Sequence, residues 1–461
     1  MLVSDHPGVT IGEMDYGAAL QYLLSFNDME RGYIRQASSN PTMSLDSMRS
    51  LLARLNDPHR GRPTIHITGS KGKGSTAAMI AGILEQNEQV TALFTSPHLH
   101  SFTERIVIDG MSISPEEFAA ALTAIRPVID AEQESVHGSV STFGIITALF
   151  FWLVRAQARP VEWQVVEVGI GGTYDATNVF ESPEVVVITP ISLEHTAILG
   201  KTTTAIARDK AGLVKPGCHV VLAPQRDPAV REVVRERCEA VGATFIDAAG
   251  SYDCEPLEKY VFGQSFLLHG PSGTRELRTP MLGRHQLDNA LTAVAVAESL
   301  RARGHHVAER AIADGIARAR VPGRMEVMGQ KPLVVADGAH NGESAAALAE
   351  TLRNYFEWKR CFFVLGMAQD KDAGAIGRQL AKLADLICCA RFRSPRSMDP
   401  YVMIQEVGFL GPPAVADDSV KDAVDTAMSH AGPDDLVCIT GSLYVVAEAR
   451  EYILGDSVVR R

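Results

Sequence analysis

The residues best suited to chemistry lie in one glycine-rich stretch, Gly69-Ser70-Lys71-Gly72-Lys73-Gly74-Ser75. Its glycines permit backbone conformations in which successive N–H groups converge on an anion, and Lys73 adds a positive charge. Ser75 carries a hydroxyl group that can ligate a magnesium ion bound to phosphate. The stretch therefore predicts a site for the phosphates of a nucleotide, with magnesium beside Ser75.

The segments on either side are those that a phosphate-binding loop requires. The apolar run Thr64–Thr68 predicts a strand, and the alanine-rich segment after Ser75 predicts a helix whose N-terminal dipole attracts anions. The spacing is a variant of GxxxxGK[ST], because Gly74 separates Lys73 from Ser75. Taken alone, such a variant also fits a flexible surface turn, but the flanking strand and helix favour the phosphate loop.

Two further polar groups follow predicted strands. Glu167 ends an apolar run just before a glycine turn, and His195 comes soon after the run Val185–Thr189. A buried carboxylate needs a partner, and a magnesium ion bound to the phosphates is an economical one. His195 is a candidate third ligand of this magnesium ion. From these residues alone, two alternatives stay open. Glu167 also fits a structural role as a hydrogen-bonded buried carboxylate, and His195 also fits a structural or a solvated position.

Additional candidates lie farther along the chain. Lys210, judged by its own neighbours, resembles an ordinary lysine on a helix surface. The predicted strand Leu333–Ala336 leads into Asp337-Gly338-Ala339-His340-Asn341, which is typical of a turn that faces a ligand. Arg324 and Lys371 are cations suited to neutralising nucleotide or carboxylate charge, although each also fits a solvated surface.

Strands and helices alternate along most of the chain, which predicts an α/β fold with ligands at the carboxyl ends of a mainly parallel sheet. Because 461 residues exceed what one core usually serves, we expect two domains, 1–318 and 319–461, joined near Arg318–Arg324. The first is a large P-loop-type domain flanked by helices, and the second a smaller Rossmann-like α/β domain. Between them, Pro256–Pro280 predicts strands and turns.

The composition of the chain argues against several classes of function and location. The chain has 46% hydrophobic and 21% charged residues, typical of a globular protein. A net charge of −11 argues against a nucleic-acid partner held by phosphate neutralisation. Seven cysteines without CxxC spacing indicate a reducing compartment and no zinc site. Met1–His6 shows no secretory signal, and Gly144–Val154 is too short to cross a membrane, so we expect a cytoplasmic protein.

These pieces, in this order, resemble the Mur ligase superfamily, and most closely its folylpolyglutamate synthase/dihydrofolate synthase branch. The similarity covers nearly the whole chain. The matching segments are Gly69–Ser75, Thr95–Leu99, Phe102–Ile106, Glu167–Gly172, Asp175–Asn178, Glu194–Thr196, Lys210–Gly212, Lys215–Gly217, His285–Ala290, Pro322–Arg324 and Asp337–Asn341.

The resemblance implies roles for these residues. Nucleotide-binding positions are Gly69, Ser70, Lys71, Gly72, Lys73, Gly74, Ser75, Asn289, Arg324 and Asp337. Metal-binding positions are Ser75, Glu167, His195 and Lys210, where Lys210 matches a lysine that is typically carbamylated and so able to support a second magnesium ion. Catalytic positions are Lys73, Lys210, His195, Asp337 and His340, and substrate positions are Ser96, Pro97, His98, Phe143, Tyr174 and Asp175.

The resemblance also implies a reaction. ATP phosphorylates a carboxylate to an acyl phosphate, which the amine of L-glutamate attacks; the acid is dihydropteroate or a folate that already bears glutamate. The substrates are small molecules, and we expect a monomer.

Five residues depart from the family pattern: Lys71 stands for asparagine, Thr173-Tyr174 for Arg-Leu, Gly144 for glutamate and Gly342 for proline. They leave two alternatives open, a Mur-type ligase for a different pterin-like or peptide-like acid, and a non-catalytic P-loop module that only binds nucleotide.

Overall fold

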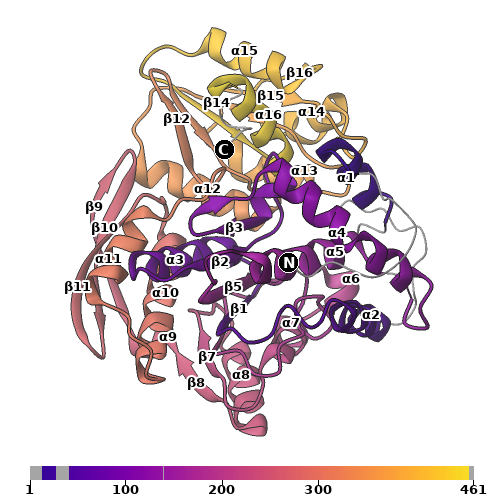
Figure 1. Ribbon diagram of the computed structural model, residues 1–461. Helices are drawn as coiled ribbons and strands as arrows, with labels where there is room; N and C mark the ends of the chain where they lie inside the picture. The colour runs from indigo at the N-terminus through magenta and orange to yellow at the C-terminus, as the bar shows by residue number, and fades with distance from the viewer. Residues whose placement is uncertain (1–12, 27–40, 139, 456–461) are drawn as a thin grey trace.

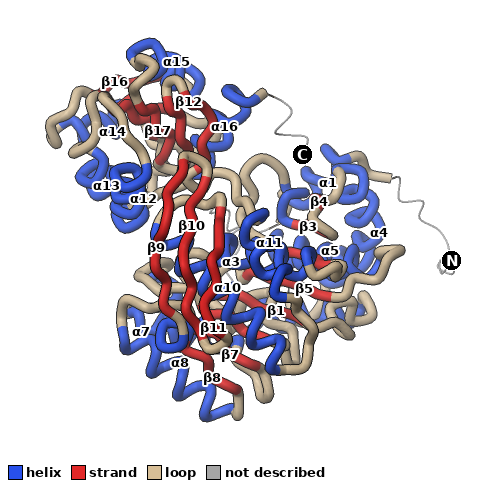
Figure 2. Tube along the Cα trace, turned by 90° about the vertical axis from the view of Figure 1, so that its left-hand side faces the viewer, coloured by secondary structure: helices blue, strands red, loops and turns tan. Residues whose placement is uncertain are grey.

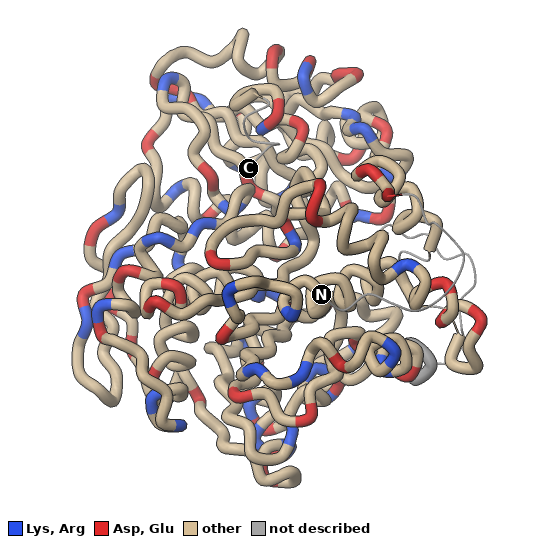
Figure 3. Tube along the Cα trace, in the orientation of Figure 1, with Lys and Arg blue, Asp and Glu red and all other residues tan. Residues whose placement is uncertain are grey.

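The computed structural model describes residues 13–26, 41–138 and 140–455, and arranges them around three β-sheets (Figure 1). The segment Met1–His6, on which the sequence predicts no secretory signal, lies outside the described residues. None of the described helices is both long and apolar enough to span a membrane. Acidic and basic residues are interspersed along the chain (Figure 3).

The largest sheet has eight strands in the order β4-β3-β2-β5-β1-β6-β7-β8. In chain order they are β1 (Thr64–Thr68), β2 (Thr91–Phe94), β3 (Ile106–Ile108), β4 (Met111–Ser112), β5 (Trp163–Glu167), β6 (Val185–Ile188), β7 (His219–Leu222) and β8 (Thr244–Asp247). Antiparallel pairing in this sheet is confined to one side, where β3 pairs with β2 and the edge strand β4 pairs with β3. Because β1 lies between β5 and β6 and is parallel to both, Thr68, Glu167 and Ile188 reach the same edge of the sheet.

Helices cover both faces of this sheet, because successive strand residues point to opposite sides. Val165 belongs to the core under α3 (Lys73–Gln86), whereas its neighbour Val166 belongs to the core on the opposite face. The first core also receives α10 (Arg284–Ala302) and α11 (Glu309–Arg318). The second core is built with α1 (Tyr16–Leu23), α2 (Pro41–Arg54), α4 (Pro115–Gln133) and α5 (Thr142–Ala156).

A third core covers the sheet near β6 and β7 and involves α7 (Thr203–Lys210), the 3₁₀ turn Ala211–Leu213 and α8 (Pro228–Val241). Short helical turns elsewhere in this part are Phe102–Arg105, α6 (Thr196–Leu199) and α9 (Ala248–Ser251). The expected mainly parallel sheet with helices on both faces is therefore confirmed.

The segment predicted as strands and turns forms a separate antiparallel sheet of β9 (Asp253–Tyr260), β10 (Gly263–Gly270) and β11 (Gly273–Thr279). We call the part built around the eight-stranded sheet the first unit, and the part built around the C-terminal sheet the second unit. Figure 2 shows these long strands running beside the helices of the first unit toward the second unit. Tyr355 of the second unit donates a 2.5 Å hydrogen bond to Gln264 in β10. The small sheet therefore touches both units.

The C-terminal unit contains a six-stranded sheet in the order β12-β13-β17-β14-β15-β16. Its strands are β12 (Glu326–Gln330), β13 (Leu333–Ala336), β14 (Cys361–Leu365), β15 (Leu386–Ala390), β16 (Ala414–Asp417) and β17 (Leu436–Thr440). Its helices are α12 (Gly342–Tyr355), α13 (Ala373–Leu380), α14 (Pro400–Gly408), α15 (Val420–His430) and α16 (Leu443–Leu454). Apolar cores lie on both faces, and the expected smaller Rossmann-like α/β arrangement is confirmed.

All seven cysteines are buried and free. Burial raises the pKa of several of these thiols, for example that of Cys238 to about 12, so they stay protonated at neutral pH. The cysteines therefore serve as packing residues of the cores.

Candidate active site

A cleft of about 1670 Å³ lies where the carboxyl ends of the strands in the first unit face the second unit. Most of the residues that the sequence singled out line it. From the first unit these are Ser70, Lys71, Gly72, Lys73, Gly74, Ser75, Ser96, Pro97, His98, Glu167, His195 and Asn289. From the second unit they are Arg324, Asp337, His340 and Lys371.

The phosphate loop has a shape that only glycine permits at two positions. Gly69 and Gly72 adopt φ values of +147° and +81°. A Cβ atom would lie 1.8 Å from Thr189 Oγ1 at the first position and 2.3 Å from Asn289 Oδ1 at the second. The loop is therefore packed between the end of β6 and α10. Helix α3 begins within the stretch, at Lys73, with its N-terminus at the cleft.

Two lysines converge on the start of this loop. Lys73 Nζ and Lys210 Nζ donate to the carbonyl oxygen of Gly69, at 3.1 Å and 2.8 Å. Lys210 also forms a 3.2 Å ion pair with Glu194. Burial lowers the pKa of Lys210 to about 8, and the positive charge of Lys73 acts in the same direction, while Glu194 opposes it. Although its sequence neighbours resemble a helix surface, Lys210 is only 1% exposed. Neither Lys210 nor Gly69 lines the cleft itself; Lys210 lies behind the loop.

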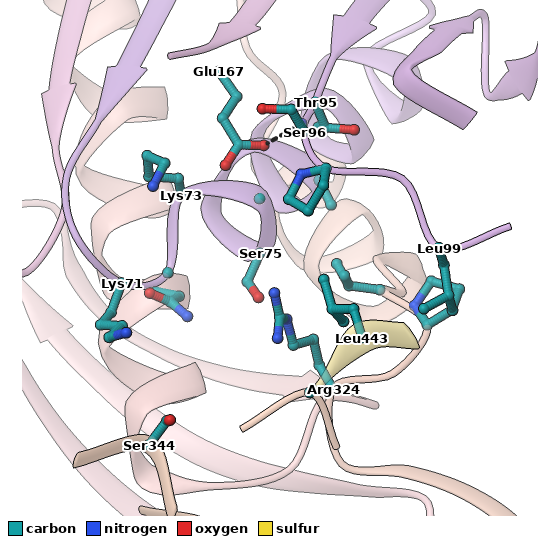
Figure 4. Close-up of a pocket in the computed structure, with 18 of the residues that line it drawn as sticks. Lys71, Lys73, Ser75, Thr95, Ser96, Leu99, Glu167, Arg324, Ser344 and Leu443 are labelled. Carbon is teal, nitrogen blue, oxygen red and sulfur yellow. Dashed lines mark hydrogen bonds between the residues drawn. The ribbon is translucent and has the colours of Figure 1, made fainter. Parts of the chain in front are cut away.

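Glu167 places its carboxylate at the N-terminus of α3. Its Oε2 accepts a 3.1 Å hydrogen bond from Ser96 N, and a Cβ atom on Gly74 would lie 3.5 Å from the same oxygen. Figure 4 shows Glu167 close to Ser96, with Lys73 and Ser75 on the neighbouring turn of the chain. The buried charge is thus compensated by a backbone donor and by the positive end of a helix dipole.

His195 lines the same cleft as the phosphate loop. It adopts a left-handed conformation with φ of +46° at the start of α6. Burial lowers its pKa; Glu194 opposes the shift, and Lys73 and Lys210 add to it. The imidazole is therefore neutral at neutral pH, the form in which histidine binds metals. Among the described residues no three His, Cys, Asp or Glu side chains form a metal cluster, whereas magnesium sites commonly combine one or two carboxylates with phosphates and water.

The second unit contributes a rigid turn after β13. The carboxylate of Asp337 accepts hydrogen bonds from Met325 N and Ala339 N, both at 2.9 Å. Burial raises the pKa of Asp337, and Arg324 opposes that shift. His340 Nδ1 lies 2.9 Å from the carbonyl oxygen of Gly338, so Nδ1 carries the proton and Nε2 keeps its lone pair. Burial, with Lys71 nearby, lowers the pKa of His340 to about 4.

Three of the predicted substrate residues do not line the cleft. Asp175 is buried, and its carboxylate accepts from Ile170 N at 3.1 Å and Thr177 N at 2.9 Å, so it shapes the glycine turn after β5. Phe143 packs its ring against Gly169, where a Cβ atom would lie 2.7 Å from the ring. Tyr174 is 44% exposed and lies outside the cleft lining.

Other cleft residues were not among the predicted site positions. Glu194 pairs with Lys210, and its position beside His195 in the sequence was the available signal. Arg226 forms a 3.0 Å ion pair with Glu343, which links the two units. His100 and Arg450 also line the cleft and contact each other, and no spacing or composition in the sequence indicates that pair.

Comparisons with known proteins identify the family of this chain. Residues 67–297 match the Mur ligase middle domain, and residues 323–443 match the Mur ligase, glutamate ligase domain. The chain is 34% identical to the dihydrofolate synthase/folylpolyglutamate synthase of Bacillus subtilis, over 88% of this chain and 94% of that protein.

Two further relatives extend the comparison. The chain is 34% identical, over 95% of its length, to a probable bifunctional folylpolyglutamate synthase/dihydropteroate synthase of Haloferax volcanii, of which it spans 50%. The crystal structure of Mycobacterium tuberculosis folylpolyglutamate synthase complexed with ADP and AMPPCP superposes with a TM-score of 0.84 and 32% identity, over 95% of this chain and 99% of that one.

Proposed function

The chain belongs to the dihydrofolate synthase/folylpolyglutamate synthase family of Mur ligases, and we propose that it uses ATP to join L-glutamate to a folate-type carboxylate. One observation carries this proposal. The phosphate loop with Lys73, the carboxylate of Glu167, and Arg324 and His340 of the second unit all line one cleft. Such a cleft can hold a triphosphate beside two further substrates.

The reaction begins with an acid that resists attack by an amine. A carboxylate oxygen of the folate-type substrate attacks the γ-phosphorus of ATP, the bond to the β-phosphate oxygen breaks, and ADP leaves. The N–H groups of the loop and Lys73 stabilise the negative charge on the transferred group. The amine of glutamate then attacks the acyl carbon, phosphate leaves, and one amine proton is released. The two units exclude water that would hydrolyse the acyl phosphate.

The proposed metal donors fit magnesium by their chemistry. Ser75 offers a hydroxyl, Glu167 a carboxylate at the N-terminus of α3, and His195 a neutral imidazole. When bound there, magnesium neutralises phosphate charge during the transfer. Lys210 fits a carbamate, because its lowered pKa leaves part of the amine neutral and able to add carbon dioxide. Lys210 as a carbamate is then an anion beside the loop rather than a cation.

We propose the remaining contacts to the nucleotide from where the residues lie relative to the phosphate loop. Asn289 lies against Gly72 of the loop. Arg324 extends toward Ser75 in Figure 4 and is suited to phosphate charge, and the turn at Asp337 is suited to the nucleoside. Ser96, Pro97 and His98 are proposed to contact the acid near its reacting carboxylate.

The pterin end of the acid is proposed to lie near Phe143, Tyr174 and Asp175. The exposure of Tyr174 supports this location, whereas Asp175 acts through the shape of the turn. We propose a monomer in the cytoplasm, with domains 1–318 and 319–461; the end of α11 at Arg318 supports that boundary.

A turnover assay tests the function and its substrate class. ADP release is measured with ATP, magnesium and L-glutamate in the presence of dihydropteroate, of a folate bearing one glutamate, or of neither. Turnover with dihydropteroate alone indicates dihydrofolate synthase activity, and turnover with both acids indicates both activities. Firm ATP binding without acid-dependent turnover would contradict the proposal.

A further inference from the structure

One loop of the first unit is seated on the second unit at the cleft. Leu99, in the loop that follows β2, packs against the apolar core around β17 and α16. A Cβ atom on Gly323 would lie 3.8 Å from both Leu99 and Leu443, and Figure 4 shows these two leucines close together. The loop is therefore an interdomain contact as well as a wall of the cleft.

Arg450, on α16, is the centre of this contact and is only 6% exposed. Its Nε and Nη2 donate to the two carboxylate oxygens of Glu326, at 2.7 Å and 3.0 Å. Its Nη1 donates to Nε2 of His100, at 2.5 Å. Bidentate pairing of this kind fixes the orientation of a guanidinium group.

The hydrogen bonds define the protonation state of His100. A guanidinium group can only donate, so His100 Nε2 must accept from Arg450 and cannot carry a proton. The proton therefore lies on Nδ1, which is 3.2 Å from Glu451 Oε1. The interdomain contact requires the neutral imidazole.

Further hydrogen bonds connect this contact to the proposed chemistry. Glu326 Oε2 also accepts from Gly323 N at 2.8 Å, next to Arg324. On the other side, Glu104 accepts from the backbone N–H groups of Leu99, His100 and Ser101, at 2.7 to 2.8 Å, which stiffens the loop. At its other end the loop donates from Ser96 N to Glu167.

We propose that Glu326, Arg450 and His100 form an interdomain clamp that seats the second unit on the loop 95–105 and thereby positions Arg324 and Glu167 for phosphoryl transfer. These three are positioning residues, because they act through their neighbours. The expected effect of the clamp on kcat rests on the proposed function. Its effect on the arrangement of the two units does not, because that arrangement is independent of the substrate.

Charged side chains surround His100 from several elements. Glu104 faces it from its own loop, Arg450 and Glu451 from α16, and Glu326 from β12 through Arg450. Arg393 forms an ion pair with Glu451 and so partly neutralises the charge of that carboxylate. Arg105 donates a 2.9 Å hydrogen bond to His98.

Paired variants test the clamp. Arg450→Met and His100→Leu remove it, whereas His100→Gln keeps a donor and an acceptor and cannot be protonated. Arg360→Met is the matched control, because Arg360 pairs with the buried Asp435 at 2.6 Å within the second unit. We expect kcat to fall about ten- to a hundredfold in the first two variants, as for other remote positioning residues. We expect His100→Gln and Arg360→Met to stay within about threefold of wild type.

Two further readouts distinguish positioning from lost folding. Small-angle X-ray scattering with AMPPCP should show an expanded molecule for Arg450→Met and His100→Leu, while circular dichroism matches wild type. Equal kcat and scattering for Arg450→Met and Arg360→Met, or equal losses in His100→Gln and His100→Leu, would overturn the clamp. If the wild-type chain turns over no acid, the ligase proposal fails, and scattering alone decides the clamp.

Discussion

The Nζ atom of Lys210 lies 2.8 Å from the carbonyl oxygen of Gly69, the first residue of the phosphate loop. Lys210 ends α7, which follows β6, so a residue 141 positions away in the sequence reaches the loop because β1 and β6 are neighbours. Burial lowers its pKa to about 8, so a part of the amine is neutral near physiological pH. This neutral fraction of the buried amine is the form that reacts with carbon dioxide.

The proposed carbamate predicts dependence on bicarbonate. Because only the neutral amine reacts, carbamate formation should rise with pH through about 8. Turnover should fall after carbon dioxide is removed and return when bicarbonate is added, as measured by ADP release. Lys210→Ala should lose most activity and recover part of it with short carboxylic acids, while Lys210→Arg should not recover. Unchanged kinetics in Lys210→Ala would show that the carbamate assignment is wrong.

Lys73→Ala should lower kcat about a hundred- to a thousandfold, because it removes a charge aimed at the transferred phosphoryl group. Steady-state ADP release with saturating substrates measures this loss. Lys359→Ala is a suitable control, since Lys359 is 75% exposed and pairs with Asp434 in the second unit. Near-normal turnover in Lys73→Ala would contradict the assignment of the phosphate loop.

Glu167→Gln should raise the magnesium concentration needed for half-maximal turnover and lower kcat about a hundredfold. The glutamine oxygen still accepts from Ser96 N, so the loop contact is retained while the charge at the N-terminus of α3 is lost. Titrations with magnesium chloride measure the shift. Glu181→Gln, at a residue that is 78% exposed, serves as the control. Identical magnesium curves for the two variants would argue against Glu167 as a ligand.

His66 predicts a loss of stability in acid. Thr177 Oγ1 donates to Asp175 at 2.6 Å and lies 2.8 Å from His66 Nε2, which therefore carries the proton of a neutral ring. Burial lowers the pKa of His66 to about 3, while an unfolded histidine has a pKa of about 6.5. Between these values the unfolded chain binds the extra proton, so stability falls as pH decreases.

Urea denaturation at several pH values measures this effect. The free energy of unfolding of wild type should fall more steeply below about pH 6 than that of His66→Gln, by up to about 1.4 kcal/mol per pH unit. His269→Gln is the control, because His269 is 42% exposed. Parallel pH curves for wild type and His66→Gln would show that burial of the neutral imidazole contributes nothing to acid sensitivity.

The sequence by itself determined the features whose parts are contiguous. A strand, a glycine turn and a helix follow one another from Thr64 to Gln86, so residue types alone predict the phosphate loop. The alternation of strands and helices also predicted a mainly parallel sheet, which brings Glu167 to the same edge as the loop because the carboxyl ends of parallel strands share an edge.

Only the tertiary structure decided the features that depend on packing between distant elements. Lys210 resembles a surface lysine until α7 is packed against the loop, and Asp175 resembles a cleft residue until its carboxylate turns inward to backbone donors. His100 and Arg450 are separated by 350 positions and meet only because the two units face each other. Burial and pairing of this kind arise from the relative placement of whole elements, and no local spacing or periodicity encodes them.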